Sequence, residues 1–122
     1  MGVLLLGPPG SGKSDLALRL IDRGAVLIAD DRVHVAADGK LYPPPSLAGL
    51  IEVRGVGIVS KPHVAGIAAR LAVDLAAEPQ RLPEAATTDV GGWRLPVVAL
   101  SAFDGSAPLK VELAVALPAV KR

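Results

Sequence analysis

The chain has 122 residues, of which 51% are apolar and 2% aromatic, and its 13 basic and 12 acidic residues leave a net charge of +1. This length predicts one domain, the charge balance argues against a nucleic-acid footprint or a polybasic membrane patch, and so few aromatic residues leave no platform for stacking bases. The lack of cysteine excludes disulfides and thiolate chemistry, and no apolar run reaches the length of about 18 residues that a membrane-spanning helix needs.

The first predicted element is a buried parallel strand at residues 3–6, a short apolar run bounded by glycine. It leads into a segment that fits G-x-x-x-x-G-K-[ST] and is followed by a helix-like pattern. The residues of this segment are Gly7, Pro8, Pro9, Gly10, Ser11, Gly12, Lys13 and Ser14.

A strand before the segment and a helix after it are the setting of a phosphate-binding P-loop. Glycines let successive N–H groups point at phosphate oxygens, and the helix adds its free amides and the positive end of its dipole. We therefore predict nucleotide binding, with Lys13 reaching the β- and γ-phosphates and the Ser14 hydroxyl ligating Mg²⁺. The alternative is a plain Gly/Pro turn between a strand and a helix.

The helical spacing of apolar residues runs from Lys13 to Gly24, where glycine supplies the C-terminal stop. Residues 26–29 then predict a second buried strand, which ends at Asp30 and Asp31. The whole is a βαβ-type unit, with its ligand expected at the carboxyl ends of the strands. A carboxylate there can hold the Mg²⁺ shell or take the proton of an attacking hydroxyl, and two adjacent aspartates can divide these tasks. The alternative is a hydrated strand end with turn-forming aspartates.

Beyond this unit, residues 33–42 predict a hairpin with an Asp-Gly turn, which the prolines at 43–45 bring to an end. Residues 50–59 are β-rich, and their Glu52 and Arg54 share one face if the segment is a strand. That pair suits a metal carboxylate beside a phosphate-binding guanidinium, or equally a surface ion pair.

The last third of the chain alternates between strand and loop signals. Residues 70–75 and 93–100 predict strands, the second with an edge or bulge at Pro96, and residues 78–92 predict a polar loop. Residues 106–120 alternate like a strand but have the composition of a helix, so the pattern decides neither. The two isolated residues His34 and His63 are expected in surface or loop positions rather than as catalytic bases.

Three separated motifs together resemble the catalytic domain of the HPr kinase/phosphorylase family, and more closely its short alphaproteobacterial form. The motifs read GPPGSGKSDLALRLIDRG, LIADD and LIEVRGVGIV. The resemblance is strongest over residues 7–60. It implies an α/β fold, a P-loop NTPase-like domain with a mixed sheet similar to that of phosphoenolpyruvate carboxykinase.

The family uses ATP and Mg²⁺ to phosphorylate a serine of HPr, a small phosphocarrier of the phosphotransferase system. It also removes the seryl phosphate by phosphorolysis. The resemblance therefore implies an enzyme with an HPr-like protein partner, cytoplasmic and homo-oligomeric, commonly as a hexamer.

Carried over by position, the resemblance assigns residues 7–14 to the nucleotide phosphates, with Lys13 catalytic. Ser14 and Glu52 match its Mg²⁺ positions. Residues 51–60 match its signature for both reactions.

Asp31 matches the proton acceptor of the kinase reaction and the proton donor of dephosphorylation, with Asp30 beside it as a second catalytic candidate. Arg81 matches a catalytic arginine. The family also has a catalytic histidine on a strand upstream of the P-loop strand. Neither His34 nor His63 matches it, and we expect that strand to be missing here.

Near the C-terminus the family has P-G-R in its dephosphorylation segment, where this chain has Pro108, Leu109 and Lys110. Lysine keeps the charge but not the bidentate fork, which weakens the prediction of phosphorylase activity more than that of kinase activity. We predict one kinase domain over residues 1–122, without the upstream strand and the C-terminal helical extension. The alternatives are a regulator that binds ATP without transferring phosphate, and a small-metabolite P-loop kinase.

Overall fold

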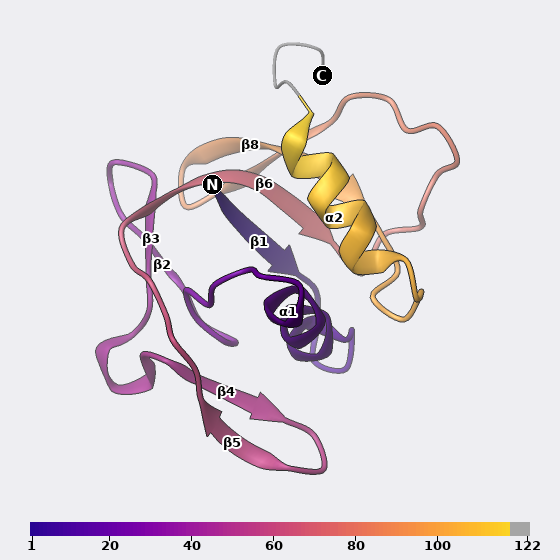
Figure 1. Ribbon diagram of the computed structural model, residues 1–122. Helices are drawn as coiled ribbons and strands as arrows, with labels where there is room; N and C mark the ends of the chain where they lie inside the picture. Colours follow the sequence, from indigo (N-terminus) through magenta and orange to yellow (C-terminus); the bar gives the residue numbers. More distant parts are fainter. Residues whose placement is uncertain (118–122) are drawn as a thin grey trace.

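A computed structural model describes residues 1–117 (Figure 1). Its elements in chain order are β1 Gly2–Leu6, α1 Lys13–Asp22, β2 His34–Val35, β3 Lys40–Tyr42, the 3₁₀ helix η1 Pro45–Leu47, β4 Leu50–Val53, β5 Gly57–Ser60, β6 Ile67–Asp74, β7 Thr87–Val90, β8 Trp93–Ala99 and α2 Ala107–Ala116. Within the described residues, neither helix has the length and apolar content to cross a membrane.

The main sheet is organised around β6. Both β1 and β8 run parallel to β6, whereas β3 pairs antiparallel with its first residues. The sheet continues outward through antiparallel β2 on one side and antiparallel β7 on the other. The strands β4 and β5 form a separate antiparallel hairpin. This mixed sheet with two helices confirms the predicted α/β class.

The parallel strands bring their carboxyl ends to one edge of the sheet. The amide of Leu75, just after β6, donates to the carbonyl of Leu6 at 2.8 Å, and the amide of Leu100, just after β8, donates to that of Asp74 at 3.2 Å. Residues 7–12, 75–86 and 100–106 therefore leave the sheet side by side. This is the edge at which an α/β sheet binds ligands.

Side-chain alternation along the strands builds a core on each face of the sheet. On one face, Val3 and Leu5 of β1 pack with both helices, which lie side by side in Figure 1. The buried residues of this face are Leu16, Leu20, Leu71, Val73, Ala102, Ala107 and Val111. The opposite face buries Leu4, Leu41, Ala72 and Leu95. Because successive residues of β1 serve opposite cores, both its faces are apolar.

The prediction of a strand at residues 26–29 is wrong. The carbonyl of Leu27 accepts from the amide of Val64 at 2.9 Å, and Leu27 makes only an isolated bridge with His63. The backbone thus bonds to the segment after β5 instead of to β1. Leu27 is still buried, whereas Val26 is 51% exposed.

Part of the predicted polar loop is also wrong, because residues 87–90 form β7. The glycines Gly91 and Gly92 have φ of 57° and 84°, and the amide of Gly92 donates to Asp89 Oδ1 at 3.0 Å. Two consecutive residues with positive φ make the tight turn of a β-hairpin, and this turn pairs β7 with β8.

The undecided segment from residue 106 is a helix over Ala107–Ala116, and residues 118–120 lie outside the described part. Pro96 lies where β8 changes partners, since residues 93–96 pair with β7 and residues 97–99 with β6. Proline has no backbone N–H to donate, but Pro96 does not pair with β6, so no hydrogen bond between β8 and β6 is lost. The hairpin predicted at residues 33–42 is confirmed as β2 and β3, and α1 ends just before Gly24 as predicted.

Candidate active site

The glycine-rich loop, residues 7–12, wraps around the N-terminus of α1. The amide of Ser11 donates to the carbonyl of Pro8 at 3.1 Å, and the carbonyl of Gly12 accepts the first helical bond from Leu16 at 2.9 Å. Gly10 and Gly12 have φ of 84° and 89°, which side chains with a Cβ rarely adopt. The glycines are thus needed for the path of this loop.

Ser11 lies folded over Gly7 inside the loop. A Cβ built on Gly7 would lie 2.5 Å from Ser11 Oγ, so a larger residue at this position would displace the Ser11 side chain. Ser11 Oγ is buried and has no hydrogen-bond partner within residues 1–117. A buried hydroxyl without a partner costs about 1–3 kcal/mol. Together with the first-turn amides of α1, which have no acceptor inside the helix, it forms a set of donors that suits an anion.

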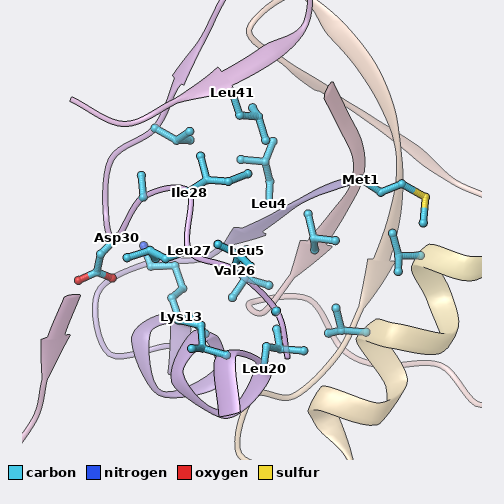
Figure 2. A pocket seen from close by; sticks show the side chains of 18 of the residues that line it. Met1, Leu4, Leu5, Lys13, Leu20, Val26, Leu27, Ile28, Asp30 and Leu41 are labelled. Carbon is cyan, nitrogen blue, oxygen red and sulfur yellow. The ribbon is translucent and has the colours of Figure 1, made fainter. Parts of the chain in front are cut away.

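Asp30 joins the start of α1 to β4. Ser14 Oγ donates to Asp30 Oδ1 at 2.8 Å, and the backbone amide of Glu52 donates to Asp30 Oδ2 at 2.9 Å. Lys13 extends from α1 toward Asp30 (Figure 2). The structure thus brings together Lys13, Ser14 and Asp30, and adds the backbone of Glu52.

Asp31 is placed differently from its neighbour. It has a φ of 61°, the only positive value among the described residues other than glycine. Aspartate tolerates this conformation better than most residues, yet it is uncommon enough to mark a constrained position. Its side chain is exposed and makes no hydrogen bond or ion pair within the described part of the chain. The left-handed turn therefore separates a held carboxylate, Asp30, from a free one, Asp31.

The side chains of the other residues considered from the sequence lie outside this arrangement. The side chain of Glu52 is exposed, and Arg54 follows β4 in the turn, so the two do not share a strand face. Arg81 lies on the exposed segment between β6 and β7 and makes no hydrogen bond or ion pair within residues 1–117. His34 and His63 are exposed, on β2 and on the loop after β5, as predicted.

A cavity of about 510 Å³ lies between β1, α1 and residues 24–33 (Figure 2). Most of the residues that line it are aliphatic, and its charged lining residues are Lys13, Arg23, Asp30, Asp31, Arg32 and Glu112. No residue of the glycine-rich loop, residues 7–12, lines this cavity. It is the space left beside β1 where residues 26–29 do not pair, and it is distinct from the anion-suited loop.

The sequence interpretation missed how Arg19 binds the segment after β8. Its Nη2 donates to the carbonyl of Ala102, its Nη1 donates to that of Asp104 at 3.1 Å, and its Nε donates to Asp15 Oδ2 at 3.0 Å. Phe103, between the two bound carbonyls, lies against Gly12. No sequence motif indicates these contacts. The one feature of the sequence that could have drawn attention to this segment is Phe103, the only aromatic residue near it.

Among the described residues, no three side chains of the His, Cys, Asp or Glu type gather as a metal site. The site instead offers one held carboxylate beside a hydroxyl and next to a set of amide donors. Such an arrangement can bind a phosphate-rich ligand whose own oxygens complete the shell of a cation.

Comparison with known proteins identifies the family of this chain. Residues 1–76 match the family described as HPr Serine kinase C-terminal domain. The chain belongs to this family. The match confirms the family that the three motifs indicated.

Individual proteins agree with this assignment. An HPr kinase/phosphorylase from Enterococcus faecalis is 48% identical over 73 residues, which cover 57% of this chain and 24% of that protein. One from Burkholderia cenocepacia is 40% identical over 121 residues, which cover 86% of this chain and 38% of that protein. The chain therefore spans less than half the length of these curated relatives.

A solved structure, the Hpr(Ser) kinase/phosphatase from Coxiella burnetii, shares the fold of this chain. Its superposition has a TM-score of 0.76 at 27% sequence identity, and covers 94% of this chain and 81% of that one.

Proposed function

We propose that this chain is an ATP- and Mg²⁺-dependent protein-serine kinase acting on an HPr-like phosphocarrier of the phosphotransferase system. The observation that carries the proposal is Asp30, which bonds Ser14 at 2.8 Å directly beside the glycine-rich loop. A phosphate-binding loop and a carboxylate are the two parts that phosphoryl transfer requires together. The names of the relatives, HPr kinase/phosphorylase, support the choice of substrate.

In this proposal the glycine-rich loop is a P-loop. Its amides and the orphan Ser11 hydroxyl bind the nucleotide phosphates, and Lys13 binds the β- and γ-phosphates. The residues present suit a magnesium ion, because Mg²⁺ is commonly held by one or two carboxylates and substrate phosphates. Ser14 would hold it together with Asp30 or Glu52, and it would neutralise charge on the transferring group.

Asp31 is the proposed general base. It accepts the proton of the carrier serine while the serine oxygen bonds to the γ-phosphorus, the bridging bond to the β-phosphate breaks, and ADP leaves. Lys13 and the loop amides stabilise the charge that develops on the γ-phosphoryl oxygens. The free and exposed carboxylate of Asp31 supports this role, because an acceptor for a bulky protein substrate must be open to solvent.

The proposed phosphorylase reaction reverses the proton transfer. Inorganic phosphate attacks the seryl phosphorus, the serine oxygen leaves with a proton from Asp31, and pyrophosphate is formed. Lys110 stands at the position of the family arginine, and its Nζ lies 3.8 Å from Asp104 Oδ2. Unlike the guanidinium of arginine, a lysine ammonium cannot bind a phosphate through two parallel hydrogen bonds. We expect the phosphorylase reaction to be the weaker one.

Several expectations stay predictions at this point. They are a single kinase domain over residues 1–122, a cytoplasmic homo-oligomer, and a catalytic role for Arg81. Arg81 lies in the exposed segment between β6 and β7, which leaves the sheet at the same edge as the glycine-rich loop.

Phosphorus NMR of a mixture of this chain, Mg·ATP and purified HPr-type carrier tests the proposal. Seryl phosphate and ADP should appear together in equal amounts. Free phosphate without seryl phosphate would contradict it. Unchanged ATP, in the presence of measurable ATP binding, would favour the nucleotide-binding regulator instead. ADP formed only after a small metabolite is added would favour the metabolite kinase.

A further inference from the structure

Phe103 is an exposed aromatic residue held against the glycine-rich loop. A Cβ built on Gly12 would lie 3.3 and 3.4 Å from Cε1 and Cζ of the Phe103 ring. The residue is nevertheless 74% exposed. The other two aromatic residues lie elsewhere in the molecule, Tyr42 next to Gly66 and Trp93 next to Gly39. One of only three aromatic side chains thus stands open to solvent at the predicted phosphate site.

The backbone on both sides of Phe103 is fixed to α1. The guanidinium of Arg19 donates to the carbonyls of Ala102 and Asp104. Asp15, one turn earlier in α1, accepts a hydrogen bond from Arg19 and orients this guanidinium. Ala102 is 1% exposed and its Cβ would lie 2.8 Å from a Cβ on Gly12. With Ala102 packed inward and both carbonyls bound, the ring of Phe103 faces outward beside the loop. An exposed aromatic side chain on a fixed backbone is preorganised for a ligand.

Phe103 and the carboxylates lie on different flanks of α1. In Figure 1 the β4–β5 hairpin lies below α1, whereas the turn that precedes α2 lies to the right of α1. Asp30 reaches Ser14 from the hairpin side, whereas Phe103 reaches Gly12 from the α2 side. Phe103 and Asp30 thus lie next to neighbouring positions of the chain, Gly12 and Ser14, from different sides.

We propose that Phe103 is the platform on which the base of the bound nucleotide stacks. This inference rests on the proposed P-loop, and it revises the expectation from composition that no such platform exists. Stacking on an aromatic ring is available to every base, because each base has a π-face, so Phe103 supplies affinity and orientation instead of base selectivity.

Calorimetric titration with two ligands tests the platform, one with a base and one without. Mg·ATP and Mg·tripolyphosphate share the phosphate chain, so only a contact to the nucleoside separates them. Phe103→Ala should weaken Mg·ATP binding roughly ten-fold and leave tripolyphosphate binding unchanged. Phe103→Trp should restore ATP affinity, since it keeps the aromatic face. Leu113→Ala, at a 70% exposed position of α2, is the matched control and should change neither affinity.

The platform would be overturned by unchanged ATP affinity in Phe103→Ala. It would also be overturned if both ligands weaken equally, because Phe103 would then only shape the loop through Gly12. A separate failure is visible in the wild-type chain. If the wild-type chain binds neither ligand, the P-loop proposal fails and the platform proposal fails with it. If the wild-type chain binds both ligands and Lys13→Ala abolishes this binding, the P-loop proposal stands whether or not Phe103 contributes.

Discussion

Asp30 and Asp31 are neighbours in the chain but have different surroundings. Both carboxylate oxygens of Asp30 accept hydrogen bonds, from Ser14 and from the amide of Glu52. Asp31 lies at a φ of 61° with a free side chain. In a regular strand the two side chains would point to opposite faces. Here the left-handed conformation of Asp31 separates its side chain from that of Asp30. We therefore propose that Asp30 holds the site together and that Asp31 does the proton chemistry.

Asp30→Ala tests the structural half of this division. The substitution leaves Ser14 Oγ and the Glu52 amide without their acceptor, so we expect the free energy of unfolding to fall by about 1–3 kcal/mol. Urea unfolding measures the change. Asp31→Asn is the control, because asparagine tolerates positive φ and Asp31 makes no contact to lose; we expect a change within about 0.5 kcal/mol. Equal losses in both variants would contradict the division.

The residue types of the site could be predicted because they sit in motifs with local spacing. The glycine-rich loop and the two aspartates each needed only a few neighbouring positions to be recognised. The bonds from Asp30 to Ser14 and from Arg19 to the segment after β8 could not be predicted. These bonds join residues that are far apart in the chain. The pattern of a single sequence does not indicate which distant residues come into contact.

At the scale of elements, α1 is anchored by a buried leucine. Leu16 is 0% exposed and belongs to the core between the helices and β6. Leu16→Ala should lower the free energy of unfolding by about 2–5 kcal/mol, because it removes buried methyl groups and leaves a cavity. Urea unfolding of Leu113→Ala, with a leucine that is 70% exposed, gives the comparison and should change by less than about 0.5 kcal/mol. Similar losses for both would show that α1 does not pack as described.

An ion pair on the surface links the two helices. The guanidinium of Arg23 donates to both oxygens of Glu112, the shortest bond being 2.8 Å, and this hydrogen bonding lowers the pKa of Glu112 from its ordinary value of 4.5. The two side chains are 43% and 40% exposed, so solvent screens the pair and its contribution is small. Since the folded pKa is the lower one, the contribution is present above pH 4.5 and is lost as the pH falls through the folded pKa.

Glu112→Gln should therefore lower the Tm slightly at about pH 7, and the difference from the wild type should vanish near pH 3. Thermal melts of both proteins at the two pH values measure this, and about 1 M salt should shrink the difference at neutral pH. A difference that persists unchanged near pH 3 would mean that the amide loses packing and not charge.

Elements with one clear local pattern were predictable, and those whose form depends on a distant partner were not. The strands at residues 3–6 and 93–100 and the helix from Lys13 have the apolar spacing of their final form. Residues 26–29 have a strand's composition, but their backbone bonds to the segment after β5. Residues 107–116 have competing patterns, and burial of Ala107 and Val111 against α1 and β6 favours the helix.

The whole molecule places its candidate machinery at one edge of a mixed sheet. The parallel strands β1, β6 and β8 bring the glycine-rich loop and the Phe103 segment together there, and Asp30, in the segment before β2, accepts a hydrogen bond from Ser14 at the start of α1. Such an edge concentrates donors for phosphates beside carboxylates, which is the chemistry of phosphoryl transfer. The fold thus places a loop suited to anions, a lysine and two aspartates within one part of the molecule.

Intact-mass spectrometry of HPr-type carrier, present in large excess over this chain with Mg·ATP, tests the central claim most directly. The wild-type chain should add one phosphate to the carrier with turnover, at a serine that fragmentation identifies. Asp31→Asn should slow the transfer by about 10²–10⁴-fold while ATP affinity stays the same. Carrier that keeps its original mass, with a chain that binds ATP, would contradict the kinase proposal. Equal rates in the wild type and Asp31→Asn would remove Asp31 as the base.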